Sequence, residues 1–203
     1  MKSYRILLPA ALLIVACTPK ARIDCTVQQA PGAQIAVRQL DMNSYKVLDT
    51  IKTDASGRAR YSLDVQPGNP EFIYLFYKDT KIASLLLEAG SNVRIKADTL
   101  GNYEVEGSPE SQQLRERELA YARFQRDMDS TLDPKELSRI FIAHYRDDVK
   151  FVMENPTSLT VMPVLFEQLD QYTPVFNQYT DAILFRKLCD TLKTVYPDSR
   201  YVK

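Results

Sequence analysis

The sequence predicts an α+β protein in which an antiparallel β-sandwich is followed by an all-α segment of about four helices. Two observations predict this order. Up to residue 107, strand-length apolar runs alternate with turns rich in Gly, Pro, Asn, Asp and Ser, which is typical of a sandwich. From Ser108 onward, apolar residues recur every three or four positions, as on one face of a helix. We therefore expect a β-sandwich domain at 17–107 and a helical segment at 108–203 that packs on or beside it.

Residues 1–16 have the pattern of a lipoprotein signal peptide. Lys2 and Arg5 form a basic start, and the apolar run that follows is shorter than the about 20 residues of a membrane-spanning helix. This run ends in the sequence LIVAC at 13–17, a lipobox in which the small Ala16 precedes Cys17. We expect cleavage after Ala16 and lipid attachment at Cys17. An ordinary signal peptide cleaved elsewhere is the alternative.

The strands are expected between clear turn signals. Alternation places Ile35, Val37 and Gln39 on one face of their strand, whereas the runs at 72–77 and 83–87 are apolar on both faces and should lie centrally or beneath the helices. Asp54, Ser56 and Gly57 fit a plain hairpin turn better than a calcium site, because no further carboxylates surround them at ligand spacing. The expected strands are 23–29, 34–40, 46–53, 58–64, 72–78, 81–88, 92–97 and 103–106.

Capping residues predict where the helices begin. Ser108 followed by Pro109 starts the first helix, and the Asp133-Pro134 pair starts the second, which ends before Pro156. The third is expected from 157 or 158 to 172, with Pro163 kinking it or marking a later start. The fourth begins after Thr180.

Composition excludes several functions. The 203 residues carry 26 basic and 26 acidic side chains, and removal of the leader leaves no basic excess, so nucleic acid is not an expected partner. Besides Cys17 only Cys25 and Cys189 are present, without a C-x-x-C motif, so neither a redox site nor a metal or cofactor site is expected. A bridge between Cys25 and Cys189 is the less favoured alternative to two free thiols.

The remaining candidate residues favour structural roles. His144, the only histidine, lies at the edge of an apolar stripe; a catalytic pair would need a partner that folding brings close. Cys189 lies between Leu188 and Leu192 and is expected to be buried packing. The charged run at 115–118 is expected to be a solvated helix surface. Six tyrosines either pack or line a groove where the sheet meets the helices: Tyr74, Tyr77, Tyr121, Tyr145, Tyr172 and Tyr179.

Nearly the whole mature chain resembles the amino-terminal region of envelope lipoproteins of the TlpA-like thiol-disulfide oxidoreductase type. The similar features are the lipobox at Cys17 and, in the same order, AQIAV at 33–37, TDASGR at 53–58, LEAG at 87–90, VRI at 93–95, VEGS at 105–108, NPTS at 155–158 and YPDS at 196–199. The resemblance implies a β-sandwich domain of unknown function and a helical segment, which in that family precede a thioredoxin-like domain with a W-C-x-x-C motif. This chain has no tryptophan and no C-x-x-C motif, so the family's redox chemistry does not carry over.

These observations favour a lipid-anchored envelope protein that acts as a non-catalytic binding or interaction module. Its expected partners are the membrane, through the lipid, and an envelope protein or small ligand. Thr18, which is not aspartate, favours the periplasmic side of the outer membrane over the inner membrane by resemblance to other lipoprotein systems. The alternative is an accessory or truncated part of a thiol-disulfide oxidoreductase system, and a third hypothesis is an enzyme that uses His144 with a neighbouring carboxylate.

Overall fold

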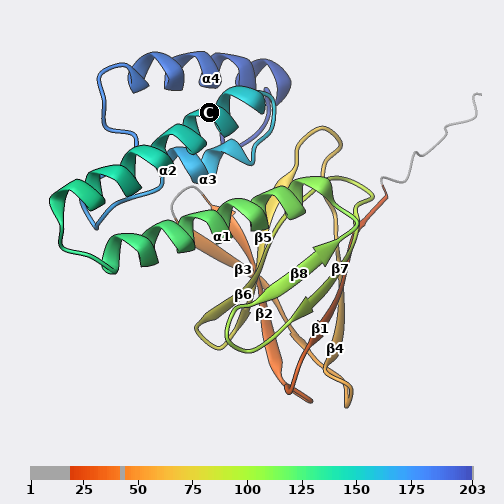
Figure 1. The fold of residues 1–203 in the computed structure, drawn as a ribbon. Helices are drawn as coiled ribbons and strands as arrows, with labels where there is room; N and C mark the ends of the chain where they lie inside the picture. The colour runs from red at the N-terminus through yellow and green to blue at the C-terminus, as the bar shows by residue number, and fades with distance from the viewer. Residues whose placement is uncertain (1–18, 42–43, 203) are drawn as a thin grey trace, which may run out of the picture.

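The computed structural model describes residues 19–41 and 44–202 and places a set of strands ahead of a set of helices (Figure 1). The signal peptide and the lipid-attachment residue Cys17 lie outside the described residues. The strands are β1 (Ala21–Val27), β2 (Gln34–Asp41), β3 (Ser44–Lys52), β4 (Arg58–Leu63), β5 (Glu71–Tyr77), β6 (Thr80–Leu87), β7 (Asn92–Ala97) and β8 (Tyr103–Glu106). The helices are α1 (Pro109–Asp129), α2 (Pro134–Glu154), α3 (Val161–Leu165) and α4 (Asp181–Val195).

The strands form two four-stranded sheets with the orders β4-β1-β7-β8 and β3-β2-β5-β6. Residues of both sheets share one apolar core, so the sheets pack face to face as in a sandwich. The alternation seen in the sequence accounts for this core, since Ile35 and Val37 are fully buried in it and Gln39, on the same face, is buried at its margin.

The expectation of a purely antiparallel sandwich is wrong at one pairing, because β1 and β7 are parallel. β1 lies between β4, to which it is antiparallel, and β7. Four strands of the other layer and β4 separate β1 from β7 along the chain, so no hairpin constrains their relative direction. Side-chain alternation is the same in parallel and antiparallel strands and therefore does not reveal this direction.

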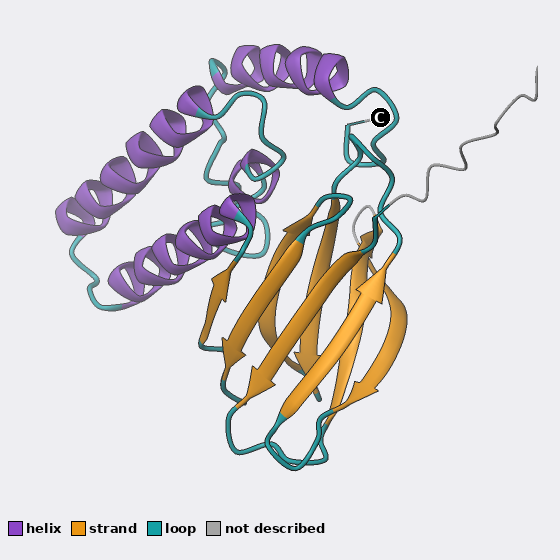
Figure 2. Ribbon diagram, turned by 90° about the vertical axis from the view of Figure 1, so that its right-hand side faces the viewer, coloured by secondary structure: helices purple, strands orange, loops and turns teal. Residues whose placement is uncertain are grey.

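A second apolar core joins the outer face of the β3-β2-β5-β6 sheet to the helices. The strand β5 is buried on both faces, with Ile73 and Leu75 in the sandwich core and Phe72 and Phe76 in the second core. Figure 2 shows the helices gathered on one side and toward one end of the sandwich. The helical segment is thus packed on the sandwich by a continuous apolar layer.

The helix α1 covers the outer edge of β6. Ser108 caps the helix by accepting a hydrogen bond from the amide of Ser111, as the sequence predicts. The hydroxyl of Ser111 also accepts from the amide of Leu86 and donates to its carbonyl oxygen, each at 3.1 Å. The hydroxyl of Ser108 donates to the same carbonyl at 3.2 Å. These contacts satisfy backbone groups that an edge strand would otherwise leave unpaired.

The third helix is much shorter than expected, since α3 ends at Leu165 and does not reach residue 172. The chain instead makes a small bridge between Gln168 and Pro174. Asp170 stabilises the intervening turn by accepting hydrogen bonds from the amides of Tyr172 and Thr173. This local side-chain bonding competes with the helix and explains why the apolar pattern did not predict its end.

Candidate functional site

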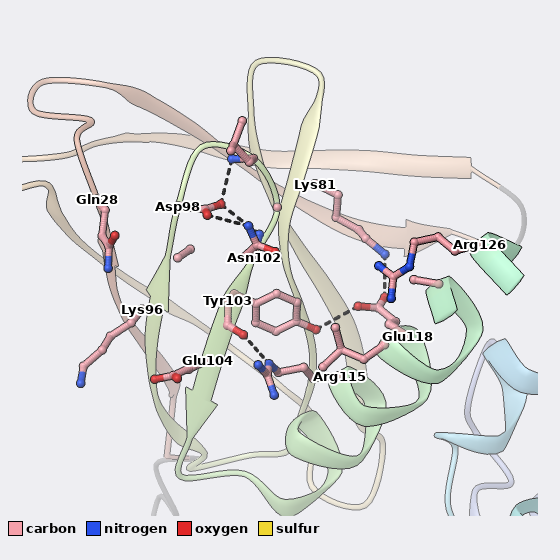
Figure 3. A pocket seen from close by; sticks show the side chains of 15 residues that line it. Gln28, Lys81, Lys96, Asp98, Asn102, Tyr103, Glu104, Arg115, Glu118 and Arg126 are labelled. Carbon is pink, nitrogen blue, oxygen red and sulfur yellow. Dashed lines mark hydrogen bonds and ion pairs between the residues drawn. The ribbon is translucent and has the colours of Figure 1, made fainter. Parts of the chain in front are cut away.

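A cavity of about 530 Å³ lies where the β7–β8 turn and the start of β6 meet α1. Figure 3 shows Lys81 of β6, Asp98 and Asn102 of the turn, and Arg115 and Glu118 of α1 around it. Because β8 ends at Glu106 and α1 already begins at Pro109, the helix runs back past β8 and forms one wall. The cavity therefore lies at the junction between the sandwich and the helical segment.

Glu118 holds the inner wall of this cavity together. Its Oε1 accepts hydrogen bonds from Lys81 Nζ and from Ser84 Oγ, both at 2.6 Å, and its Oε2 accepts from the Tyr103 hydroxyl at 2.9 Å. Burial raises the pKa of Tyr103, and the charge of Glu118 raises it further, so the phenol remains protonated and donates. Ser84 is fully buried and its hydroxyl proton is given to a carboxylate, so this serine is not an exposed nucleophile.

The turn that forms the opposite wall is ordered by Asp98. Its Oδ1 accepts from the amides of Leu100 and Asn102 at 2.8 and 2.9 Å, and its Oδ2 accepts from the Asn102 side chain at 2.7 Å. The Asn102 hydrogen bond in particular holds the pKa of Asp98 below its usual range. The carboxylate of Asp98 is therefore occupied by the turn itself and does not reach out for a ligand.

Two guanidinium groups on α1 remain available to a ligand. Arg115 donates through Nε to the carbonyl oxygen of Tyr103, which leaves its terminal nitrogens free. Neither Arg115 nor Arg126 forms an ion pair with a carboxylate in the described part of the chain. The exposed side chains of Leu100 and Leu119 lie on the same lining. This arrangement suits a ligand with an anionic group next to an apolar part.

A second cluster, buried among the helices, centres on His144. Its Nε2 lies 2.7 Å from Glu167 Oε2 and 3.1 Å from Asp148 Oδ2. The imidazole stacks on Phe124 with ring centroids 3.9 Å apart and an interplanar angle of 7°. Asp148 is fully buried, and His144 and Glu167 are nearly so. Folding thus brings to His144 two carboxylates that the sequence alone does not place beside it.

Arg117 connects this cluster to α1. Its Nη2 contacts Asp148 Oδ1, its Nη1 lies 2.7 Å from Asp147 Oδ2, and its guanidinium carbon lies 4.9 Å from the ring centroid of Phe151. The expectation that residues 115–118 form a solvated surface is therefore wrong for Arg117 and Glu118. The signal that identifies Arg117 is its position three residues after Leu114, within the buried face of α1.

Burial dominates the proton affinities of the His144 cluster. It raises the pKa of Asp148 to about 7 and that of Glu167 to about 8, while it lowers the pKa of His144. The charge of Glu167 adds to the shift at Asp148, whereas the charges of His144 and Arg117 oppose it. Neutral pH is thus close to the pKa of both carboxyls. None of the three residues lines the cavity of Figure 3.

The two described cysteines are both free and lie in different environments. Cys25 is fully buried in the sandwich core, and burial raises the pKa of its thiol to about 12. Cys189 is exposed, which contradicts the expectation that it packs in the interior. The buried face of α4 is narrow there and holds Leu188 and Leu192. Cys189 follows Leu188 directly and is therefore turned about 100° away from that face.

The six tyrosines do not share a groove. Tyr74 is buried, whereas Tyr172 and Tyr179 are strongly exposed. None of the six lines the cavity of Figure 3.

No protein-family model matches the chain, and no curated protein matches it. Among the described helices, none is long and apolar enough to cross a membrane.

Proposed function

We propose that the chain is a lipid-anchored envelope protein that serves as a non-catalytic binding module for a small anionic ligand. The lipobox at Cys17 supports the anchor, and Thr18 supports the periplasmic side of the outer membrane. The order of the sequence motifs supports a relationship to the front half of thioredoxin-like lipoproteins. The binding site of this module is the cavity of Figure 3.

The observation that carries this proposal is the pair of arginines over an apolar lining. Arg115 and Arg126 lie eleven positions apart on α1, which is close to three helical turns, so they face the same side of the helix. Between them on that side lies the exposed Leu119. Guanidinium groups bind carboxylate or phosphate through paired hydrogen bonds, and the leucine accommodates an apolar part of the same ligand.

The position of the cavity relative to the anchor favours a soluble ligand over a lipid of the anchoring membrane. The anchor precedes β1, whereas Gln28, which lines the cavity, follows it. β1 spans roughly 17 Å between Arg22 and Val27 at about 3.3 Å per residue. The cavity thus lies at the end of this strand opposite to the one where the chain enters from the lipobox side of the sequence.

The cysteines support a module without thiol chemistry of its own. Reduction of a disulfide needs an accessible thiolate and a second thiol that can close the new bond. Cys25 has neither access nor a low pKa. Cys189 lies on the exposed surface of α4, in the other part of the molecule.

Binding can be tested with inorganic pyrophosphate as the anionic probe, followed by amide chemical shifts of the purified full chain in detergent. We expect saturable shifts confined to the cavity lining, at Gln28, Lys81, 96–104 and 115–126. The double substitution Arg115→Gln, Arg126→Gln should weaken binding at least tenfold. The control Arg186→Gln, Lys187→Gln removes the same charge from exposed positions of α4 and should bind normally. Equal loss in both double variants, or shifts spread over the whole surface, would contradict a specific site.

A second candidate is an accessory part of a thiol-disulfide oxidoreductase system, which the exposed free thiol of Cys189 favours. Insulin reduction with dithiothreitol distinguishes the two. We expect no turnover above background from the purified chain. Turnover that is lost in the Cys25→Ala, Cys189→Ala double variant would favour the accessory role instead.

A further inference from the structure

We propose that His144, Asp148 and Glu167 form a binding site for one divalent metal ion, for which zinc is the best match. His144 and Asp148 occupy positions i and i+4 on one face of α2, and Glu167 follows α3. One ligand atom from each residue can be chosen so that all three lie within 4.8 Å of one another. Folding thus brings a nitrogen donor and two carboxylate oxygens from separate elements to one buried point.

The hydrogen bonding of the cluster leaves electron pairs unsatisfied at this point. Nε2 of His144 carries at most one proton, yet two carboxylate oxygens face it. When that proton is given to Glu167 Oε2 at 2.7 Å, Asp148 Oδ2 is left fully buried and without a hydrogen-bond partner in the described residues. Buried carboxylate oxygens without a partner are rare and costly, and a metal ion satisfies them directly.

The charges around the site also call for a divalent cation. Asp147 and Asp148 share a single guanidinium, that of Arg117, and Glu167 pairs with His144. Once a metal ion displaces the protons of the cluster, its three carboxylates and the guanidinium of Arg117 have an excess of two negative charges. One divalent ion balances this excess, and its own ligands would be the two buried carboxylates and the imidazole.

The three side chains are already held in place by neighbours that are not ligands. The Phe124 ring fixes the plane of the imidazole, and Arg117 holds Asp148 through the oxygen that faces away from His144. The segment around Glu167 is fastened by the amide of Val175, which donates to the Glu167 carbonyl, and by Tyr121, which donates to the Gln168 carbonyl. Partners of this kind orient metal ligands and increase affinity.

The donor set selects among metals. One imidazole and two carboxylates match the mixed nitrogen and oxygen ligands of zinc, and the separations of 2.7 and 3.1 Å from Nε2 need only slight opening for bonds of about 2.0–2.2 Å. Calcium and magnesium prefer sites made of oxygen alone. Because the ligands join α2 to the chain after α3, the ion would act as a structural link within the helical segment.

The test uses the full chain purified without a histidine tag and treated with chelator, then titrated with zinc chloride. We expect one zinc ion per chain and a Tm rise of about 5 to 10 °C when free zinc reaches a hundredfold excess over Kd. Cobalt(II) should give the visible absorption of a low-coordinate nitrogen and oxygen site. Residues that only form hydrogen bonds with one another and bind no metal would not produce this absorption.

Glu167→Gln tests the assignment with little change of shape, and His144→Gln provides a second ligand variant should the first unfold. Each should raise the zinc Kd at least tenfold and abolish the cobalt spectrum, whereas Glu154→Gln, at an exposed carboxylate of α2, should behave as the parent protein. A parent protein that shows neither zinc stoichiometry nor a zinc-dependent Tm would overturn the proposal. Equal zinc affinity in Glu167→Gln and the parent would do the same. Neither result bears on pyrophosphate binding, which takes place at the separate cavity.

Discussion

Replacement of Ser111 by alanine tests how α1 is attached to the sandwich. The substitution removes the acceptor of the Leu86 amide, whereas the Leu86 carbonyl keeps its hydrogen bond from Ser108. Ser111 is fully buried, so water does not replace the lost acceptor without rearrangement. One orphaned buried donor costs about 1–3 kcal/mol. The better helix propensity of alanine returns up to about 0.5 kcal/mol, so we expect a net loss of about 1–2 kcal/mol.

Urea unfolding of the purified protein measures this loss, and a decrease of about 2–4 °C in Tm per kcal/mol should accompany it. Ser138→Ala is the matched control, because Ser138 is an exposed helical serine whose hydroxyl bonds only to the Pro134 carbonyl. Amide exchange gives a local readout, since the Leu86 amide should lose protection in Ser111→Ala and keep it in the control. The reasoning fails if Ser111→Ala is as stable as Ser138→Ala and the Leu86 amide remains protected.

Three further outcomes are expected. Cys17→Ala should accumulate unprocessed precursor without palmitate label, and continued labelling would disprove the lipid attachment. In the native protein at pH 8 a maleimide should modify Cys189 and spare Cys25, because the Cys25 thiol is buried and its pKa is raised to about 12. An increase to pH 9 should leave Cys25 unmodified for the same reason. Mass spectrometry of the peptides reports the modification of each cysteine. Gly57→Ala should destabilise the protein by about 1–3 kcal/mol more than Gly68→Ala in urea unfolding. Both glycines have positive φ, but of the two only Gly57 would bring the added Cβ against a backbone atom, the carbonyl oxygen of Val27. Equal losses of stability in the two variants would contradict this steric argument.

The strands could be predicted closely because their ends are fixed by local chemistry. Asp54 accepts hydrogen bonds from the amides of Ser56 and Arg58, which closes the hairpin that the sequence signals. Ser108 and Asp133 accept from the first amides of α1 and α2 in the same way. The parallel pairing of β1 with β7 could not be predicted, because it depends on how two distant strands meet and not on any residue within them.

The candidate sites were less visible in the sequence because their partners are distant along it. Glu167 follows His144 by 23 residues and belongs to a segment that was expected to be helical. The i, i+4 pair of His144 and Asp148 is present in the sequence, but such a pair is common on solvated helices. Only the burial of Asp148, which requires α1 and the chain after α3, distinguishes this pair from an ordinary surface one.

The charged run on α1 shows why neighbouring residues of one helix serve different partners. Consecutive residues are turned about 100° from each other, so Arg117 and Glu118 cannot face the same element. Arg117 lies on the side of Leu114 and Phe124 and meets Asp148 of α2, whereas Glu118 lies on the side of Arg115 and meets Lys81 of β6. When a long helix is covered on two sides and carries charged residues on both, some of these charges are buried. Each buried charge then requires a partner of opposite charge. The cavity and the His144 cluster are the places where α1 meets those requirements, one toward the sandwich and one toward α2.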